Sequence, residues 1–148
     1  MGLNLDYLDV AHRSSTYGYF TRQYVDDGAY VLSSEYQTIE RVHFHFNKKM
    51  LEGLPKPHLY PKNLDWRGRI VEDDLKFVTS QQYDIAIHFV QQSTLSLASF
   101  SAQLKASFRI GPSCMDIRLN DLVLPTRLDF GGFLNDLKTY FNKINSHA

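Results

Sequence analysis

Apolar and polar residues alternate most regularly between positions 83 and 90. Side chains along a strand point to opposite faces with period two, so this alternation predicts a strand with one buried face. The apolar face carries Tyr83, Ile85, Ile87 and Phe89. The other face carries Asp84 and His88 among smaller apolar residues. We expect the apolar face to lie beneath another element of the fold.

Four further strands are predicted downstream, at 95–100, 104–110, 114–119 and 122–124. Turn residues separate them, including Gly111-Pro112-Ser113 and Asn120-Asp121. Connections this short favour antiparallel neighbours, so the pattern predicts an antiparallel meander over residues 83–124.

The N-terminal half has weaker patterns. Residues 3–12 read as a short helix or an irregular lead-in, and 16–25 as an aromatic-rich strand. Asp26-Asp27-Gly28 predicts a hairpin turn, with a return strand at 29–32. Another strand is expected at 36–46, and one helical turn at 48–51. Residues 70–82 predict a helix, with a strand at 75–79 as the competing interpretation.

The C-terminus predicts an amphipathic helix. Its large apolar residues follow the i, i+3, i+4, i+7 spacing of one helical face from Phe130 to Ile144. Asp129 precedes them and is a suitable N-cap. An apolar stripe of this size must be buried, and the inner face of the meander is the surface available to it.

Together these elements predict a single α+β domain over residues 1–148. Its sheet is expected to be twisted and mostly antiparallel, built from the 83–124 meander and the N-terminal strands, with the C-terminal helix packed on one face. A hydrophobic content of 43% and an aromatic content of 14% supply enough material for such a core.

The charge balance and the cysteine content exclude some classes of function and location for this protein. Sixteen basic residues balance sixteen acidic ones, so no global field steers the protein to nucleic acid or to an anionic membrane. A single cysteine, Cys114, excludes an internal disulfide framework. The first residues lack the pattern of a signal peptide, and no apolar run has the length of a membrane span. We therefore expect a soluble cytoplasmic protein without a membrane partner.

Residues 53–69 form a proline-rich, basic loop that differs from the rest of the chain. It holds three of the five prolines, which disfavour a regular helix or a central strand. From 48 to 69 there are six basic side chains and two acidic ones, a local net charge of +4. Partner-binding residues are predicted at Lys56, Tyr60, Lys62, Trp66, Arg67 and Arg69.

Basic residues with interleaved aromatics are typical of a protein-binding hot spot. They also occur on nucleic-acid-binding surfaces, which is the less favoured interpretation here. The alternative interpretation of the 53–69 loop is structural, with Trp66 closing the end of the core.

A second candidate site is a group of histidines. Arg41, His43 and His45 share one face of the predicted 36–46 strand, and Asp84 and His88 share one face of the 83–90 strand. If these strands were neighbours, His43, His45 and His88 could bind a divalent metal of the zinc or iron type. The alternative is a sheet face that carries histidines without a ligand.

No nucleotide-binding, hydrolase or metalloprotease motif occurs in the chain. We therefore predict a non-enzymatic binding module without a cofactor: an inhibitor, immunity-type or accessory protein that recognises another protein through the 53–69 loop and exposed aromatics. The alternative function is a small-molecule or metal-binding domain, including a metal-dependent enzyme, that uses His43, His45 and His88.

Overall fold

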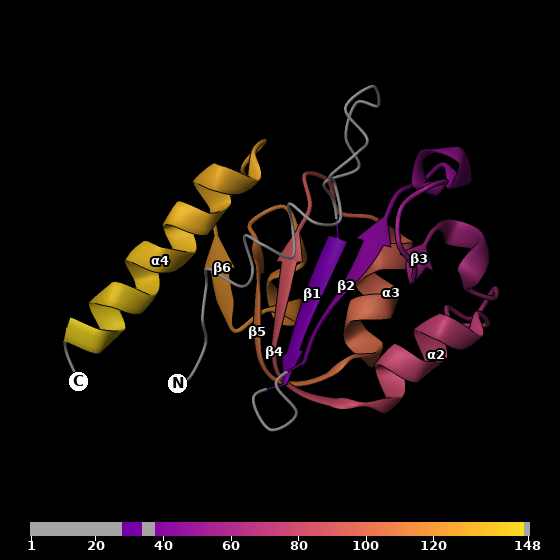
Figure 1. Ribbon diagram of the computed structural model, residues 1–148, viewed down its shortest axis with the longest axis horizontal. Helices are drawn as coiled ribbons and strands as arrows, with labels where there is room; N and C mark the ends of the chain where they lie inside the picture. Colours follow the sequence, from indigo (N-terminus) through magenta and orange to yellow (C-terminus); the bar gives the residue numbers. More distant parts are fainter. Residues whose placement is uncertain (1–27, 34–37, 147–148) are drawn as a thin grey trace.

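The computed structural model describes residues 28–33 and 38–146, which form a six-stranded sheet flanked by helices (Figure 1). The strands lie in the order β3-β2-β1-β4-β5-β6 across the sheet. Their bounds are β1 Gly28–Ser33, β2 Thr38–Phe44, β3 His58–Leu59, β4 Gln82–Phe89, β5 Lys105–Pro112 and β6 Leu122–Leu124. The α+β class is therefore confirmed.

The sheet is mixed, so the prediction of a mostly antiparallel meander is wrong. Strand β1 pairs antiparallel with β2 on one side and with β4 on the other. The pairs β2–β3, β4–β5 and β5–β6 are parallel. Only β1 therefore runs against the direction of the other five strands.

Helix α3 (Leu95–Gln103) is the reason for the parallel pairing of β4 and β5. Parallel neighbours need a crossover, and α3 supplies it where the sequence predicted a strand at 95–100. Its buried positions are Leu97, Phe100 and Ser101, which follow helical spacing. The Thr94 side chain accepts a hydrogen bond from the backbone N–H of Leu97 at 3.1 Å and so caps the helix.

The predicted strand at 114–119 is also absent. This segment is a turn followed by a 3-10 turn, η3 (Ile117–Leu119). The Asp116 carboxylate accepts from the backbone N–H of Arg118 at 3.0 Å, which favours the turn over an extended chain. Alternation of Met115, Ile117 and Leu119 was misleading because Ile117 is exposed.

The other predicted elements are close to those observed. Strands β4, β5 and β6 match the strands predicted near 83–90, 104–110 and 122–124. Residues 70–82 contain a helix, α2 (Asp73–Ser80), and not the competing strand. The turn at 48–51 is the 3-10 turn η1 (Lys48–Leu51). The proline-rich loop contains the short strand β3 and a second 3-10 turn, η2 (Pro61–Asn63).

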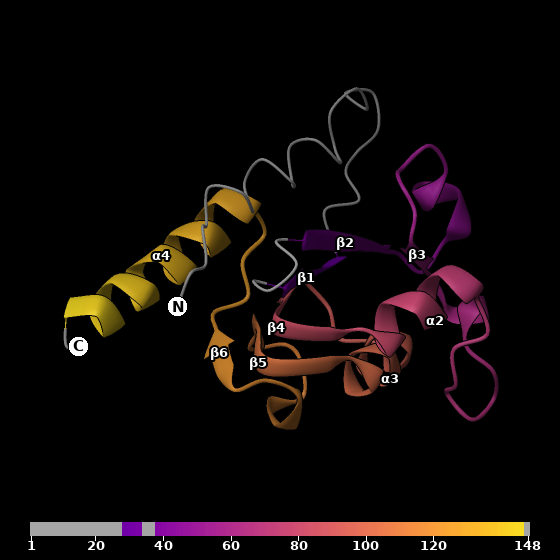
Figure 2. The same ribbon diagram turned by 60° about the horizontal axis from the view of Figure 1, so that its bottom comes forward.

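Helices cover both faces of the sheet. Helix α4 (Phe130–Ser146) lies on one side, and α2 and α3 lie on the other (Figures 1 and 2). On the α4 side, Phe133 and Leu137 are fully buried against β1, β4 and β5. The Asp129 carboxylate accepts from the backbone N–H of Gly132 at 2.8 Å at the start of α4. The prediction that the last helix packs on one face is confirmed.

The predicted inner face of β4 is confirmed for three of its four residues. Ile85, Ile87 and Phe89 pack in the core beneath α4. Tyr83 instead packs in the core on the α2–α3 side, where its hydroxyl donates to Glu40 Oε2 at 3.1 Å.

Some predictions concern residues outside the described part of the chain. They are those for 3–12, for 16–25, for the first residues of the 26–28 turn and for the start of the 36–46 strand. Among the helices that are described, none combines the length and the apolar character needed to cross a membrane.

Candidate functional site

Residues 64–70 form a tight hairpin between η2 and α2. Leu64 and Ile70 make an antiparallel bridge at its base. The backbone N–H of Asp65 donates to the carbonyl oxygen of Arg69 at 2.8 Å, and that of Gly68 donates to the carbonyl oxygen of Asp65 at 2.9 Å. Gly68 has φ of +78°, a conformation that favours glycine. The hairpin is therefore closed by its own backbone.

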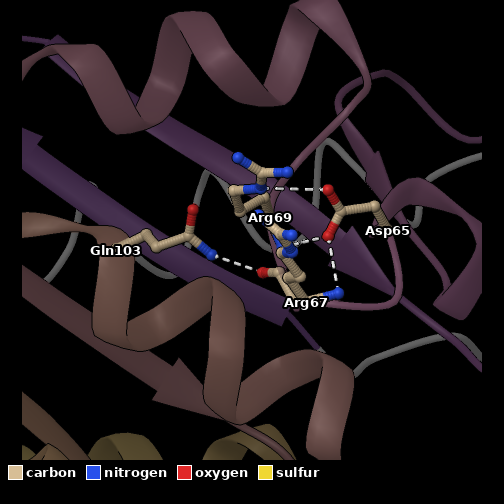
Figure 3. A network of polar contacts seen from close by, with 5 residues as sticks. Asp65, Arg67, Arg69 and Gln103 are labelled. Carbon is tan, nitrogen blue, oxygen red and sulfur yellow. Dashed lines mark hydrogen bonds and ion pairs between the residues drawn. The ribbon is translucent and has the colours of Figure 1, made fainter.

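The Asp65 carboxylate fixes the inside of the hairpin (Figure 3). Its Oδ1 accepts from the backbone N–H groups of Arg67 at 2.8 Å and Arg69 at 2.9 Å. Its Oδ2 pairs with Arg69 Nε at 3.1 Å. These hydrogen bonds, led by the one from the Arg69 backbone, lower the pKa of Asp65.

Helix α3 anchors the hairpin from outside. The Gln103 side chain reaches from α3 to the loop in Figure 3, where Nε2 donates to the carbonyl oxygen of Gly68 at 2.8 Å. The same Nε2 lies 2.9 Å from the carbonyl oxygen of Ser99. A Cβ at Gly68 would lie 3.1 Å from Ser99 Oγ, so the loop and helix are in close contact. The hairpin is thus held in one position.

This hairpin presents Trp66 to solvent. The side chain is 86% exposed, which contradicts the alternative that Trp66 closes the end of the core. The Arg67 guanidinium carbon lies 4.6 Å from the centre of the indole ring, a cation–π contact that orders the two side chains together. A large aromatic group is therefore displayed on a fixed loop with a positive charge beside it.

The structure brings only some of the predicted partner-binding residues together. Trp66, Arg67 and Arg69 share the hairpin, although Arg69 is paired with Asp65. Lys62 is exposed in η2, next to the hairpin. Tyr60 is half-buried just before η2.

Lys56 lies apart, at a shallow hollow between α2 and the segment before β3. The hollow measures about 230 Å³, which is below the usual size of a small-molecule site. Its lining residues are Glu40, Lys56, Pro57, Asp74, Phe77 and Val78.

The three histidines predicted as a metal site do not converge. Strands β2 and β4 are separated by β1, so they are not neighbours. In register, His43 lies opposite Gly28, whereas His88 lies opposite Ala29, the next residue of β1. Adjacent positions of a strand face opposite sides, so His43 and His88 point to opposite faces of the sheet. His45 Nδ1 accepts from the backbone N–H of Asn47 at 2.9 Å.

Across the described residues, no three His, Cys, Asp or Glu side chains gather in a way that could hold a metal ion. The geometry of the described residues therefore gives no support to the predicted cluster.

His88 instead belongs to a buried polar network beneath α3. Its Nδ1 lies 3.0 Å from the carbonyl oxygen of Ile110, and its Nε2 lies 2.9 Å from Ser101 Oγ. A carbonyl oxygen only accepts, so Nδ1 carries the proton and Nε2 accepts from the serine hydroxyl. Burial lowers the pKa of His88 to about 4, and the nearby positive charge of Arg109 acts in the same direction.

Arg109 completes this network from β5. Its guanidinium donates to the carbonyl oxygens of Ser101 and Leu104 at the C-terminal end of α3, where a positive charge complements the helix dipole. Ser101 Oγ and His88 Nε2 lie at hydrogen-bond distance, as a nucleophile and its base would, but both side chains are fully buried. The network joins α3 to β4 and β5.

Sequence reasoning missed Ser101, Gln103 and Arg109. The signal for Ser101 was available: it lies four residues after Leu97 and one after Phe100, on the buried face of a helix. Gln103 and Arg109 act through contacts between distant segments, and no local pattern marks such contacts.

No curated protein and no solved structure matches the chain. The model of one protein family, described as a family of unknown function (DUF6913), matches residues 21–144. This match spans β1 to α4 and most of the sequence, and the chain therefore belongs to the DUF6913 family.

Proposed function

We propose that this protein is a non-enzymatic binding module that recognises another protein through the hairpin at 64–70. The single observation that carries the proposal is the exposure of Trp66 on a loop that is otherwise fixed. Tryptophan and arginine are the residue types that most often dominate the energy of a protein interface.

The energetics favour a partner that covers the indole. Burying a tryptophan removes about 200 Å² of mostly apolar surface from water, which corresponds to about 5 kcal/mol of gross transfer free energy. Because Asp65 and Gln103 already hold the loop, little conformational entropy is lost when the partner binds. The matching surface on the partner is an apolar recess with a carboxylate placed to meet Arg67.

The hairpin is tested with a double variant, W66A/R67A. Immobilised wild-type and variant proteins are compared in capture from an extract of the native host, followed by mass spectrometry. The matched control is L128A, which removes another exposed apolar side chain, 82% exposed, far from the hairpin in sequence. The expected result is a protein captured by wild type and L128A and lost from W66A/R67A.

Thermal unfolding of the same variants separates binding from stability. Because the Trp66 side chain is 86% exposed, the midpoint of W66A/R67A is expected within about 2 °C of wild type. A much larger decrease would assign the hairpin a structural role. Capture of the same proteins by W66A/R67A and wild type would also contradict the proposal.

A further inference from the structure

Two short turns at the carboxyl ends of β2 and β3 carry a cluster of lysines. The two strands are parallel neighbours, with His43 opposite His58 and Phe44 opposite Leu59, so the turns that follow them lie at the same end of the sheet (Figure 1). Turn η1 follows β2 and η2 follows β3. We call the surface formed by the exposed Lys48, Lys49 and Lys62 and the half-buried Tyr60 the basic ledge.

Asparagine side chains hold both turns of the ledge. Asn47 Oδ1 accepts from the backbone N–H of Lys49 at 3.0 Å at the start of η1. Asn63 is buried, and its Oδ1 accepts from the backbone N–H of Tyr60 at 2.8 Å across η2. The two turns are linked because Lys48 Nζ lies 5.7 Å from the centre of the Tyr60 ring. The backbone that carries the lysines is thus pre-organised.

Within the described part of the chain, no carboxylate forms an ion pair with Lys48, Lys49 or Lys62. One exposed acidic residue, Glu52, directly follows η1. An apolar contact point lies beside the lysines, because Phe46 precedes η1 and is 55% exposed, while its ring packs edge-on against Phe44 at 5.8 Å. The surface therefore combines a local positive field with one exposed aromatic ring.

We infer that the basic ledge binds an acidic polypeptide segment of the partner protein, with an apolar residue seated against Phe46. This inference deepens the proposed function and rests on it, since the ledge and the hairpin adjoin through η2 and the backbone N–H of Val71 donates to the carbonyl oxygen of Asn63 at 2.8 Å. A polypeptide fits better than a nucleic acid because the chain has no formal net charge and the ledge supplies only three lysines, whereas nucleic-acid binding depends on neutralising many backbone phosphates. The ledge steers the acidic segment, and the hairpin supplies the apolar anchor.

The inference is tested with a defined probe, a fluorescein-labelled oligoglutamate peptide, by fluorescence anisotropy at low ionic strength. The test variant is K48E/K62E. Its matched control is K76E/K105E, which changes the net charge equally at exposed lysines of α2 and β5. K48E/K62E is expected to weaken peptide binding by about tenfold and the control by less than about twofold, and physiological salt weakens wild-type binding.

Further arms of the experiment separate the alternatives. W66A/R67A is expected to retain most of its affinity for oligoglutamate, so failure of the hairpin proposal and failure of the ledge proposal give different results. Oligothymidine and phosphatidylserine vesicles serve as nucleic-acid and membrane probes and are expected to bind more weakly than oligoglutamate. Tighter binding of either probe, equal losses in the two lysine variants, or no oligoglutamate binding at low salt would overturn the inference.

Discussion

Acidification should destabilise the protein through the buried side chain of His88. In the folded state burial keeps the imidazole neutral, and its two ring nitrogens are engaged with Ile110 and Ser101. Its folded pKa of about 4 lies below the ordinary value of 6.5. The unfolded chain therefore binds a proton at a higher pH than the folded protein does, and stability decreases as the pH falls.

The magnitude follows from the two pKa values. Each unit of pKa difference between the unfolded and folded states corresponds to about 1.4 kcal/mol. The free energy of unfolding is therefore predicted to fall by about 3 kcal/mol between pH 7 and pH 4. Stability falls most steeply with pH between the two pKa values, from about pH 6 to about pH 4.5. Exposed carboxylates such as Asp116, whose hydrogen bonds with Arg118 lower its pKa to about 2, contribute at lower pH.

Urea unfolding measured across this pH range is the assay. The control variant H45Q removes a half-exposed histidine and should keep the wild-type pH dependence. The test variant H88Q should lose most of it and should also be less stable at pH 7, because it removes the contacts of the buried ring. The His88 imidazole resonance of the wild type, followed by NMR, measures its pKa directly. A pKa near 6.5, or a flat stability profile in the wild type, would refute the reasoning.

Three further predictions concern the hairpin and the core. D65A should lower the fluorescence anisotropy of the single tryptophan, since the loop loses its internal hydrogen bonds; unchanged anisotropy would show that the backbone alone holds it. G68A should destabilise by about 1 kcal/mol in urea because φ is +78° there, whereas G131A, in an exposed helical position, should be neutral or stabilising. F133A should lower the free energy of unfolding by about 3–5 kcal/mol, and L128A should lower it by less than about 0.5 kcal/mol. Similar losses in the two variants would contradict the packing of α4.

The elements with strong periodic patterns were predictable from the sequence. Helix α4 and strand β4 each bury one face, and their patterns of apolar residues match that burial. Helix α3 was missed because Leu95, Leu97 and the following small residues alternate like a strand over a short run, although Thr94 supplies a helix cap. Without that crossover, short connections suggested antiparallel pairing.

The candidate site was predicted in part. The composition of residues 53–69 identified the segment that displays Trp66 and Arg67, because proline and basic residues exclude it from the core. Its precise form depends on contacts between distant positions, such as Gln103 with Gly68, which no local pattern encodes. The predicted histidine cluster does not form because β1 lies between the strands that carry His43 and His88. The order of strands and the face to which each side chain points are set by tertiary packing.

Site-specific photo-crosslinking at position 66 tests the central claim most directly. Benzoylphenylalanine replaces Trp66 in one variant and Leu128 in a second, and both are irradiated in cells of the native host. Both positions are highly exposed, so they differ in location and not in accessibility. We predict one discrete protein adduct from position 66 that is absent from position 128. No adduct at position 66, or the same adducts from both positions, would contradict it.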